Sequence, residues 1–367
     1  MNIPRALLLT SIWTASLSAE LLPTAWAEDD WAWIRARGAQ FVTSPSSEGG
    51  ERPFIPVGIG YCRDVIIKAQ DEEVMKFCRS HDLNTVRLAF YTRFFNNKGD
   101  RPIDIEEHIR TFIDPVVQAA KKEGLHVILD GHEYLSAAID EATARQKQKS
   151  RLWNEDEIQQ WTDAWKKVAA HYKDEPFVLG YEIMNEPHDI DPADARRILT
   201  RCLKAIREVD QKHIVFLSNC DWSHARAMEK TWGDVASTVD APYHNVAFTF
   251  HEYPEDNNPW EVAKDVTAFR NKHGVPVLCT EFGATQWNKS ETVCRKFQAG
   301  MLAFFAKEDV GWMVWALKTL TDNPRNPYNQ VDKTGLGPPP SHDSCQYSDL
   351  WAPVARIMAS PAPQPAR

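Results

Sequence analysis

The sequence lacks any dense run of lysine and arginine. Its 367 residues include 42 basic and 51 acidic side chains, for a net charge of -9 at pH 7. Binding of nucleic acid is therefore disfavoured, because it depends on clustered positive charge that neutralises phosphates. The hydrophobic content of 43% is typical of a globular protein with ample material for a core.

The spacings that mark metal and nucleotide sites are also absent. The seven cysteines include no Cys-x-x-Cys pair and no zinc spacing, and neither His-x-His nor His-Glu-x-x-His occurs. Gly58-x-Gly60 has no third glycine and no phosphate-binding sequence after it, which disfavours a nucleotide. Several cysteines fall in apolar patterns as small hydrophobes, and the sequence fixes no disulfide pair.

No apolar run is long enough to span a bilayer comfortably. Near the amino terminus, Arg5 precedes an apolar stretch from Ala6 to Leu17, and Ala25-Trp26-Ala27 offers a small-x-small cleavage site. We therefore predict a signal peptide over residues 1–27 and a secreted or periplasmic protein with no stable membrane anchor. A retained anchor is the alternative. Export implies a polymeric or oligomeric substrate outside the cytoplasm.

From residue 54 onward, eight strand-like segments alternate with amphipathic stretches. The expected strands are 54–62, 85–90, 126–132, 178–185, 213–219, 246–253, 275–282 and 311–317. The expected helices are 71–81, 105–123, 155–172, 191–210, 223–232, 261–273, 292–307 and 349–358. This alternation predicts the α/β class and a parallel sheet closed into a (β/α)8 TIM barrel.

The barrel is expected to make up one catalytic domain over residues 28–359. Residues 31–43, with Phe54, resemble a small hairpin or cap before the first barrel strand. The irregular segment 319–347 leaves the carboxyl end of the eighth strand and should form one wall of the cleft. The tail 360–367 is rich in proline and alanine and is interpreted as a frayed terminus.

Two glutamates end short, mostly apolar runs. Glu186 follows residues 179–185, and Glu281 follows residues 275–280. A carboxylate at the end of a buried strand is unfavourable unless it is paired or hydrogen-bonded. The carboxyl ends of the strands are where such barrels build their active sites. Two such carboxylates on separate strands suggest the pair of a glycosidase.

Side-chain alternation predicts which neighbours face the barrel axis, because residues two apart on a strand share a face. Three pairs are expected to point inward with the later member nearest the mouth: Asp130 with His132, His251 with Tyr253, and Met313 with Trp315. Cys279 shares a face with Glu281 and is expected to fill the barrel below it. Asn185 and Glu186 are adjacent, so their joint use requires a bend or bulge.

Six ordered motifs resemble glycoside hydrolase family 5, the cellulase-type retaining glycosidases with a (β/α)8 barrel. Residues 179–188 fit the family's acid/base motif, and Thr280-Glu-Phe-Gly283 resembles its nucleophile strand. The other four are similar to motifs of its second, third, sixth and eighth strands: Asn84–Leu88, Val127–His132, Phe250–Pro254 and Trp312–Trp315. Together they cover residues 54–317 in order, whereas one Asn-Glu-Pro would be weak evidence.

The resemblance implies that Glu186 is the general acid/base and Glu281 the nucleophile. The first role needs a carboxylic acid that protonates the leaving oxygen, and the second an ionised carboxylate that attacks the anomeric carbon. Such a mechanism needs no metal and no organic cofactor. The resemblance further implies substrate-binding or supporting roles for six residues: Arg87, His132, Asn185, His251, Tyr253 and Trp315.

Within this set, the implied roles differ. Arg87 would keep Glu281 ionised, and the hydroxyl of Tyr253 would bond to the same carboxylate. Asn185 would bind the 2-hydroxyl of the sugar, and Trp315 would form the apolar floor of the subsite. The two histidines would line the reacting subsite.

Structural interpretations stand beside these roles. Either glutamate alone could be an ion-pair partner, and Arg87 could neutralise Glu182, which shares a face with Glu186. His132 beside Asp130 could be half of a metal site completed by His251, although no metal motif supports it. Trp312, on the face opposite Trp315, is expected to face core or helix. Five aromatic residues at or after strand ends are either sugar platforms or loop packing: Tyr61, Tyr134, Trp222, Trp260 and Trp287.

The substrate is expected to be a β-linked polysaccharide or oligosaccharide, with β-1,4-glucan first and the protein acting as a monomer. A β-mannanase or another β-glycanase or exo-β-glycosidase on the same scaffold is the alternative. From other classes, a non-catalytic carbohydrate-binding barrel or a metal-dependent hydrolase is weaker. Thr280 stands where the family frequently has a small residue such as glycine, which puts the neighbouring sugars in question.

Overall fold

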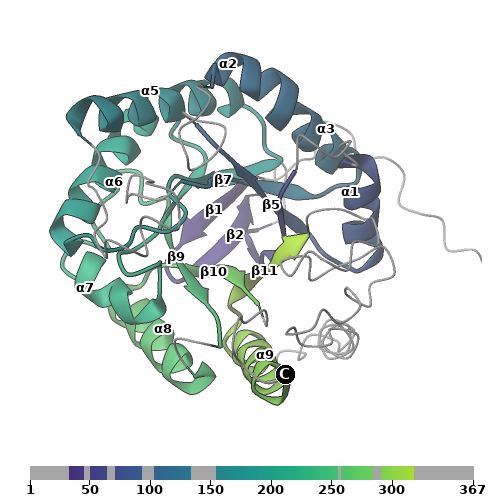
Figure 1. Cartoon of the computed structure of the whole chain (residues 1–367), viewed down its shortest axis with the longest axis vertical. Coiled ribbons are helices and arrows are strands. Elements are labelled where there is room, and N and C mark those ends of the chain that lie inside the picture. Colours follow the sequence, from purple (N-terminus) through teal and green to yellow (C-terminus); the bar gives the residue numbers. More distant parts are fainter. Residues whose placement is uncertain are drawn as a thin grey trace, which may run out of the picture.

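The computed structural model describes residues 33–44, 50–63, 71–92, 103–133, 154–254, 258–283 and 291–317. Eight parallel strands close into a barrel in the order β10-β11-β4-β5-β6-β7-β8-β9, with helices around it (Figure 1). The predicted α/β class and TIM barrel are therefore confirmed. The predicted signal peptide, the tail, residues 319–347 and the helix over 349–358 lie outside the described residues.

All eight barrel strands lie within three residues of their predicted bounds at each end. The strands are β4 (Val57–Tyr61), β5 (Thr85–Phe90), β6 (His126–Gly131), β7 (Val178–Glu182), β8 (Ile214–Leu217), β9 (Val246–Glu252), β10 (Val277–Phe282) and β11 (Gly311–Leu317). The first strand is shorter than expected, because Arg52–Phe54 instead forms β3 of a separate sheet with β1 (Trp33–Arg37) and β2 (Gln40–Ser44). This sheet is the predicted cap.

Helices follow the strands as the apolar spacing predicted. The described helices are α1 (Asp71–Ser80), α2 (Ile105–His108), η2 (Ile109–Ile113), α3 (Asp114–Lys122), α5 (Glu155–Tyr172), α6 (Pro192–Arg207), η3 (Ala225–Ala227), α7 (Met228–Trp232), α8 (Pro259–His273) and α9 (Glu291–Glu308). The predicted helix over 105–123 contains a π-helical turn, η2. None of the described helices is long and apolar enough to cross a membrane.

Side chains that compete with the backbone for hydrogen bonds fix several helix starts. Asn154 accepts a hydrogen bond from the Glu157 amide at 2.9 Å, and the Glu157 carboxylate accepts one from the Asn154 amide at 2.8 Å. This capping box begins α5, and Asp191 begins α6 by accepting from the Ala193 amide. Such caps typically contribute about 1 kcal/mol each.

The core has two layers. Inward side chains of the strands fill the barrel, while outward ones pack against the helices in a second, larger cluster. Ile34 of β1 and Phe41 of β2 join the inner cluster, so the cap closes the barrel at the amino ends of the strands. In Figure 1 these two strands are seen through the ring of the barrel. The other end of the barrel is therefore the one available for a site.

The prediction that Cys279 fills the barrel below Glu281 is wrong. Cys279 belongs to the outer layer, and Leu278 occupies the interior. The cause is a register irregularity of β10 against β9 between Cys279 and Glu281, which breaks the alternation of faces. The other inward pair that this core tests is confirmed: Met313 lies in the interior below Trp315, and Trp312 packs on Phe305 of α9.

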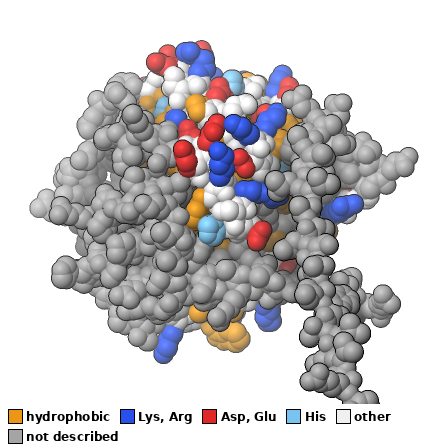
Figure 2. Space-filling view, turned by 90° about the vertical axis from the view of Figure 1, so that its right-hand side faces the viewer, with side chains coloured by type: hydrophobic (Ala, Val, Ile, Leu, Met, Phe, Trp, Pro, Cys, Tyr) orange, Lys and Arg blue, Asp and Glu red, His pale blue; other side chains and the backbone are white. Residues whose placement is uncertain are grey.

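The surface carries both signs of charge. On the face shown in Figure 2, basic and acidic side chains are interspersed where the residues are coloured. Exposed ion pairs of the described surface include Lys122 with Glu72 and Lys167 with Glu106. Among the described cysteines, five carry free thiols: Cys62, Cys78, Cys202, Cys220 and Cys279.

Candidate active site

Asn185 and Glu186 both reach the barrel axis because the chain leaves strand geometry before them. β7 ends at Glu182, three residues earlier than predicted, and the Asn185 amide then donates to the carbonyl of Gly131 at 3.0 Å. Glu182, Asn185 and Glu186 consequently all contact groups inside the barrel mouth. The expected bend is present at this point, in place of a regular strand.

Glu281 reaches the same space through the irregularity of β10. Thr280 and Glu281 are neighbours, yet the hydroxyl of Thr280 and the carboxylate of Glu281 both point inward. A regular strand would send them to opposite faces. The bulge therefore adds a hydroxyl to the mouth beside the carboxylate, and the sequence did not reveal it.

Arg87 connects the carboxylates from below. Its side chain is fully buried, and its Nε donates to Glu182 Oε2 at 2.6 Å. One terminal nitrogen, Nη1, donates to Glu281 Oε2 at 3.1 Å. The other, Nη2, donates to Asn185 Oδ1 at 2.8 Å and lies 3.1 Å from Asp130 Oδ2. Arg87 thus pairs with Glu182 and with Glu281, so the contacts that both interpretations require are present.

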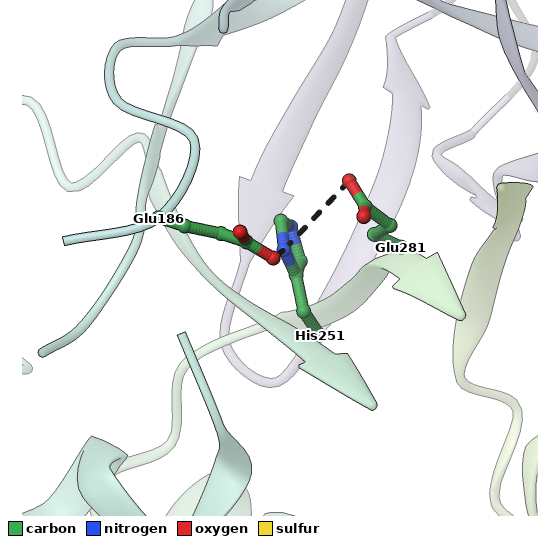
Figure 3. Close-up of side chains that lie close together, drawn as sticks. All are labelled: Glu186, His251 and Glu281. Carbon is green, nitrogen blue, oxygen red and sulfur yellow. Dashed lines mark hydrogen bonds and ion pairs between the residues drawn. The ribbon is translucent and has the colours of Figure 1, made fainter. Parts of the chain in front are cut away.

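Glu186 and Glu281 meet around His251 (Figure 3). His251 Nδ1 lies 2.8 Å from Glu186 Oε1 and 3.8 Å from Glu281 Oε2. The hydroxyl of Tyr253 donates to Glu281 Oε1 at 2.6 Å. The inward pair of His251 and Tyr253 is therefore confirmed, with each side chain on a different carboxylate.

The charges around His251 shift its pKa strongly. Burial lowers that pKa, but the charge of Glu281, the carboxylate of Glu182 at 3.6 Å from Nε2 and the hydrogen bond with Glu186 outweigh burial and raise it to about 10. Burial acts to raise the pKa of Glu186, and the hydrogen bond with His251 reverses this and lowers it. Burial and the charge of Glu186 raise the pKa of Glu281, against the effects of His251 and Arg87. At neutral pH, His251 is therefore charged, and its ring carries a proton beside the carboxylate of Glu186.

Burial also acts to raise the pKa of Glu182, but Arg87 and His251 outweigh it and lower that pKa to about 2. Glu182 is thus an ionised carboxylate across the physiological range. Burial acts to lower the pKa of Arg87, but the charges of Asp130, Glu182 and Glu281 outweigh it and raise that pKa.

His132 and Trp315 form an apolar wall beside these groups. The two rings stack with centroids 4.9 Å apart, and the guanidinium of Arg87 lies 5.5 Å from the centre of the indole. His132 Nδ1 also bonds to Asp130 Oδ2 at 2.8 Å, as the shared face predicted. A Cβ atom at Gly60 of β4 would lie 2.5 Å from the Trp315 ring, so glycine makes room for the indole here.

The side chains of Glu186, His251 and Glu281 could supply ligand atoms to a metal, because one such atom from each lies within 4.8 Å of the others. Two observations argue for another use. Arg87 already brings a permanent positive charge to Glu281, and His251 Nδ1 is engaged with Glu186. Within the described residues, the proposed pair of His132 and His251 is not such a group.

The candidate sugar platforms separate by exposure. Trp222, which follows β8, is 42% exposed and stacks on His188, two residues after Glu186, with ring centroids 3.6 Å apart. Trp260 at the start of α8 is 84% exposed. Tyr61 is buried and its hydroxyl donates to Asp71, so its role is structural. Tyr134 and Trp287 lie outside the described residues.

All eight predicted site residues thus lie in one connected group, and sequence reasoning missed one polar contact. Thr280 Oγ1 lies 2.6 Å from Glu182 Oε1 and 3.0 Å from His251 Nε2. The available signal was a hydroxyl side chain in an otherwise apolar strand, directly before Glu281. Its inward direction depends on the bulge, which the sequence pattern does not indicate.

Comparisons with known proteins bear on the family and the fold of this chain. The family model described as cellulase (glycosyl hydrolase family 5) matches residues 53–320. A β-xylosidase of Phanerodontia chrysosporium is 23% identical over 66% of this chain and 55% of its own length. Endoglucanase A of Butyrivibrio fibrisolvens is 28% identical over 59% of this chain and 44% of its own. The chain thus spans about half the length of these curated relatives.

Solved structures share the fold at low identity. The cellulase Cel5C_n superposes with a TM-score of 0.65 at 18% identity, covering 92% of this chain and 96% of that one. The catalytic domain of the Thermobifida fusca endoglucanase Cel5A gives a TM-score of 0.62 at 17% identity, covering 90% and 98%. An endocellulase of Pyrococcus horikoshii, solved with cellotetraose, gives 0.63 at 17% identity over 90% and 99%.

Proposed function

The chain belongs to glycosyl hydrolase family 5, and from this premise we propose that it is a retaining β-glycosidase with Glu186 as acid/base and Glu281 as nucleophile. One observation carries the proposal: oxygens of the two carboxylates lie within 4.8 Å of each other. Retaining enzymes hold their carboxyl groups about 5 to 5.5 Å apart, whereas inverting enzymes leave room for a water at roughly 6.5 to 9.5 Å.

The neighbours of Glu281 suit a nucleophile. Arg87 Nη1 and the Tyr253 hydroxyl donate to different oxygens of this carboxylate, at 3.1 and 2.6 Å. Both donors stabilise the ionised form, which must attack the anomeric carbon and form a covalent glycosyl-enzyme. Two donors also fix the rotation of the carboxylate, so that its attacking oxygen is already aimed.

The neighbours of Glu186 suit a proton donor and acceptor. Its side chain faces Glu281 from the segment after β7, and its Oε1 lies 2.8 Å from His251 Nδ1. In the first step, the proton of this pair passes to the leaving oxygen. In the second, Glu186 accepts a proton from the water that hydrolyses the glycosyl-enzyme. Asn185, held by Arg87, is placed to bind the sugar 2-hydroxyl.

The role assignment is tested by azide rescue of two variants. Glu281→Ala should lose nearly all hydrolysis and, with azide, form a glycosyl azide of inverted configuration, because azide replaces the missing nucleophile. Glu186→Ala should lose about 10²–10⁴-fold on substrates that need acid assistance and form a retained glycosyl azide from an activated aryl glycoside. Wild-type rates on β-glycans in both variants would refute the proposal, and azides of the opposite configurations would exchange the roles.

The substrate is proposed to be β-1,4-linked glucan. The support is that endoglucanases recur among the similar proteins, and that neighbouring structures were solved with cellotetraose. The β-xylosidase similarity, and a 36% identical stretch of 114 residues in an endoglycoceramidase of Cyanea nozakii, keep other β-glycosides open as the alternative. A chromatographic product profile across β-glucans, mannans, xylans and xyloglucan would identify both the sugar and the endo or exo mode.

Export is proposed on the sequence alone. Expression of the full chain in a bacterial host followed by amino-terminal sequencing should give a mature protein that starts after Ala27, recovered outside the cytoplasm. An uncleaved, membrane-bound product would instead support the retained anchor.

A further inference from the structure

Thr280 connects the two acidic sides of the mouth through His251. Its Oγ1 is 2.6 Å from Glu182 Oε1 and 3.0 Å from His251 Nε2, and all three side chains are almost completely buried. The bulge of β10 alone brings this hydroxyl inward. A hydroxyl has one hydrogen to donate, so these two contacts determine each other.

Glu182 determines which contact the hydroxyl hydrogen of Thr280 makes. Its second oxygen, Oε2, already accepts from Arg87 Nε at 2.6 Å, and this ion pair keeps the carboxylate ionised. A carboxylate has no hydrogen to give, so the hydroxyl of Thr280 must donate to Glu182 Oε1. The lone pairs of Oγ1 then face His251 Nε2, which must carry a hydrogen to make the 3.0 Å contact favourable.

The other ring nitrogen is consequently left for Glu186. His251 Nδ1 lies 2.8 Å from Glu186 Oε1. When the hydrogen of the neutral ring is on Nε2, Nδ1 is free to accept a hydrogen bond from a protonated Glu186. When the ring is charged, Nδ1 carries the proton and donates it to the ionised Glu186. The same proton therefore lies between Nδ1 and Glu186 in both states. In the opposite tautomer, Nδ1 would keep its own hydrogen and Glu186 could hold no proton on this side.

We propose that Thr280 is a positioning residue that fixes the tautomer of His251, so that His251 and Glu186 share the one proton required by the acid step. This rests on the proposed role of Glu186 and deepens it. The raised pKa of His251 agrees with the arrangement, because the relay to Glu182 also stabilises the charged ring.

Several charged or titratable groups contact this pair or one another and together set its titration. They come from five strands of the barrel or the segments that follow them: Arg87, Asp130, His132, Glu182, Glu186, Glu281 and Tyr253. Thr280 carries no charge, so its replacement changes the proton position without adding or removing a charge.

Thr280→Val tests the proposal because valine keeps the branched shape and removes the hydroxyl. The alkaline limb of the kcat/KM profile should move to lower pH by about one unit, since the charged ring loses a hydrogen bond of the strength typical for ions. Rates on substrates with poor leaving groups should fall about tenfold at neutral pH, with little change for aryl glycosides that leave without a proton. Thr280→Ser, which restores the hydroxyl, should match the wild type in both respects.

An unchanged alkaline limb in Thr280→Val, or an equal change in Thr280→Ser, would overturn the proposal. A second readout does not require turnover: ¹⁵N NMR of the labelled imidazole from neutral to alkaline pH, assigned by the signal lost in His251→Gln. The wild-type ring should lose the proton at Nδ1 and keep it at Nε2, and Thr280→Val should lose its proton at lower pH. A wild-type ring that keeps hydrogen on Nδ1 contradicts the proposal.

Failure of the wild type to hydrolyse any β-glycoside would refute the function, and the NMR result would still decide the tautomer.

Discussion

The two ends of the barrel each bury an arginine, and the partners of the two arginines differ. At the closed end, Arg207 makes two hydrogen bonds to the carboxylate of Asp240, at 2.8 and 2.9 Å. Its other bonds go to backbone carbonyls at 2.8 to 3.3 Å, those of Asp210, His213 and Asn245. One cation thus meets one anion, and every donor is used.

At the open end, Arg87 is shared by three carboxylates. Asp130, Glu182 and Glu281 all lie within 3.1 Å of its nitrogens. Negative charge therefore exceeds positive charge at the open end even when His251 is protonated, and this excess favours holding a proton there, which suits acid and base chemistry. The difference teaches that a buried arginine with a full, neutral set of partners indicates stability, whereas one shared by an excess of carboxylates indicates function.

The largest effects are expected from removing each cation. Arg207→Met should lower the free energy of unfolding by roughly 3–5 kcal/mol, because it leaves Asp240 buried and unpaired, while the folded protein keeps its kcat. Arg87→Met should lower kcat/KM at least about a hundredfold, because the carboxylate of Glu281 loses the hydrogen bond that orients it and the positive charge beside it. Denaturant unfolding and steady-state kinetics at a temperature where both variants are folded would measure the two effects.

Removing the anions as well makes the test sharper. Arg207→Met with Asp240→Leu should recover most of the lost stability, since a buried pair can be replaced by apolar side chains at little cost. Arg87→Met with Glu182→Leu should not recover activity, because Glu281 is still without its guanidinium donor. If the first double variant stayed as unstable as the single one, or the second regained activity, the distinction between the two ends would be lost.

The sequence predicted the strands of the barrel and the two glutamates well, and the direction of individual side chains less well. Long apolar periodicities indicated all eight strands, and ordered motifs indicated Glu186 and Glu281, because both signals survive small errors in register. The inward direction of Thr280 and the outward direction of Cys279 were not predictable, since one bulge reverses faces that strict alternation assigns. The burial of Arg207 was not predictable either, because its partner Asp240 lies far along the chain in an irregular segment.

A smaller change at the open end tests whether Glu281 depends on its second donor. Tyr253→Phe removes the hydroxyl that donates to Glu281 Oε1 at 2.6 Å. A bond to the ionised form lowers a carboxyl pKa, so its loss should raise the pKa of Glu281 and move the acidic limb of kcat/KM to higher pH. We expect roughly tenfold to hundredfold lower kcat and a stability change of about 1 kcal/mol or less. An acidic limb that stays in place would show that Arg87 and His251 set the charge of Glu281 without help from Tyr253.

The smallest effect is expected when two exposed aromatic residues at opposite ends of the barrel are replaced and compared. Trp222, 42% exposed, stacks on His188 beside the segment of Glu186, and Tyr243, 43% exposed, lies over Arg207 at the closed end. Since stacking of a sugar face on an indole adds binding energy, Trp222→Ala should raise KM for oligosaccharides about tenfold with little change in kcat. Tyr243→Ala removes a ring of similar exposure and should leave both constants unchanged. Equal effects on KM would mean that substrate also contacts the closed end, and no effect from either would remove Trp222 from the substrate path.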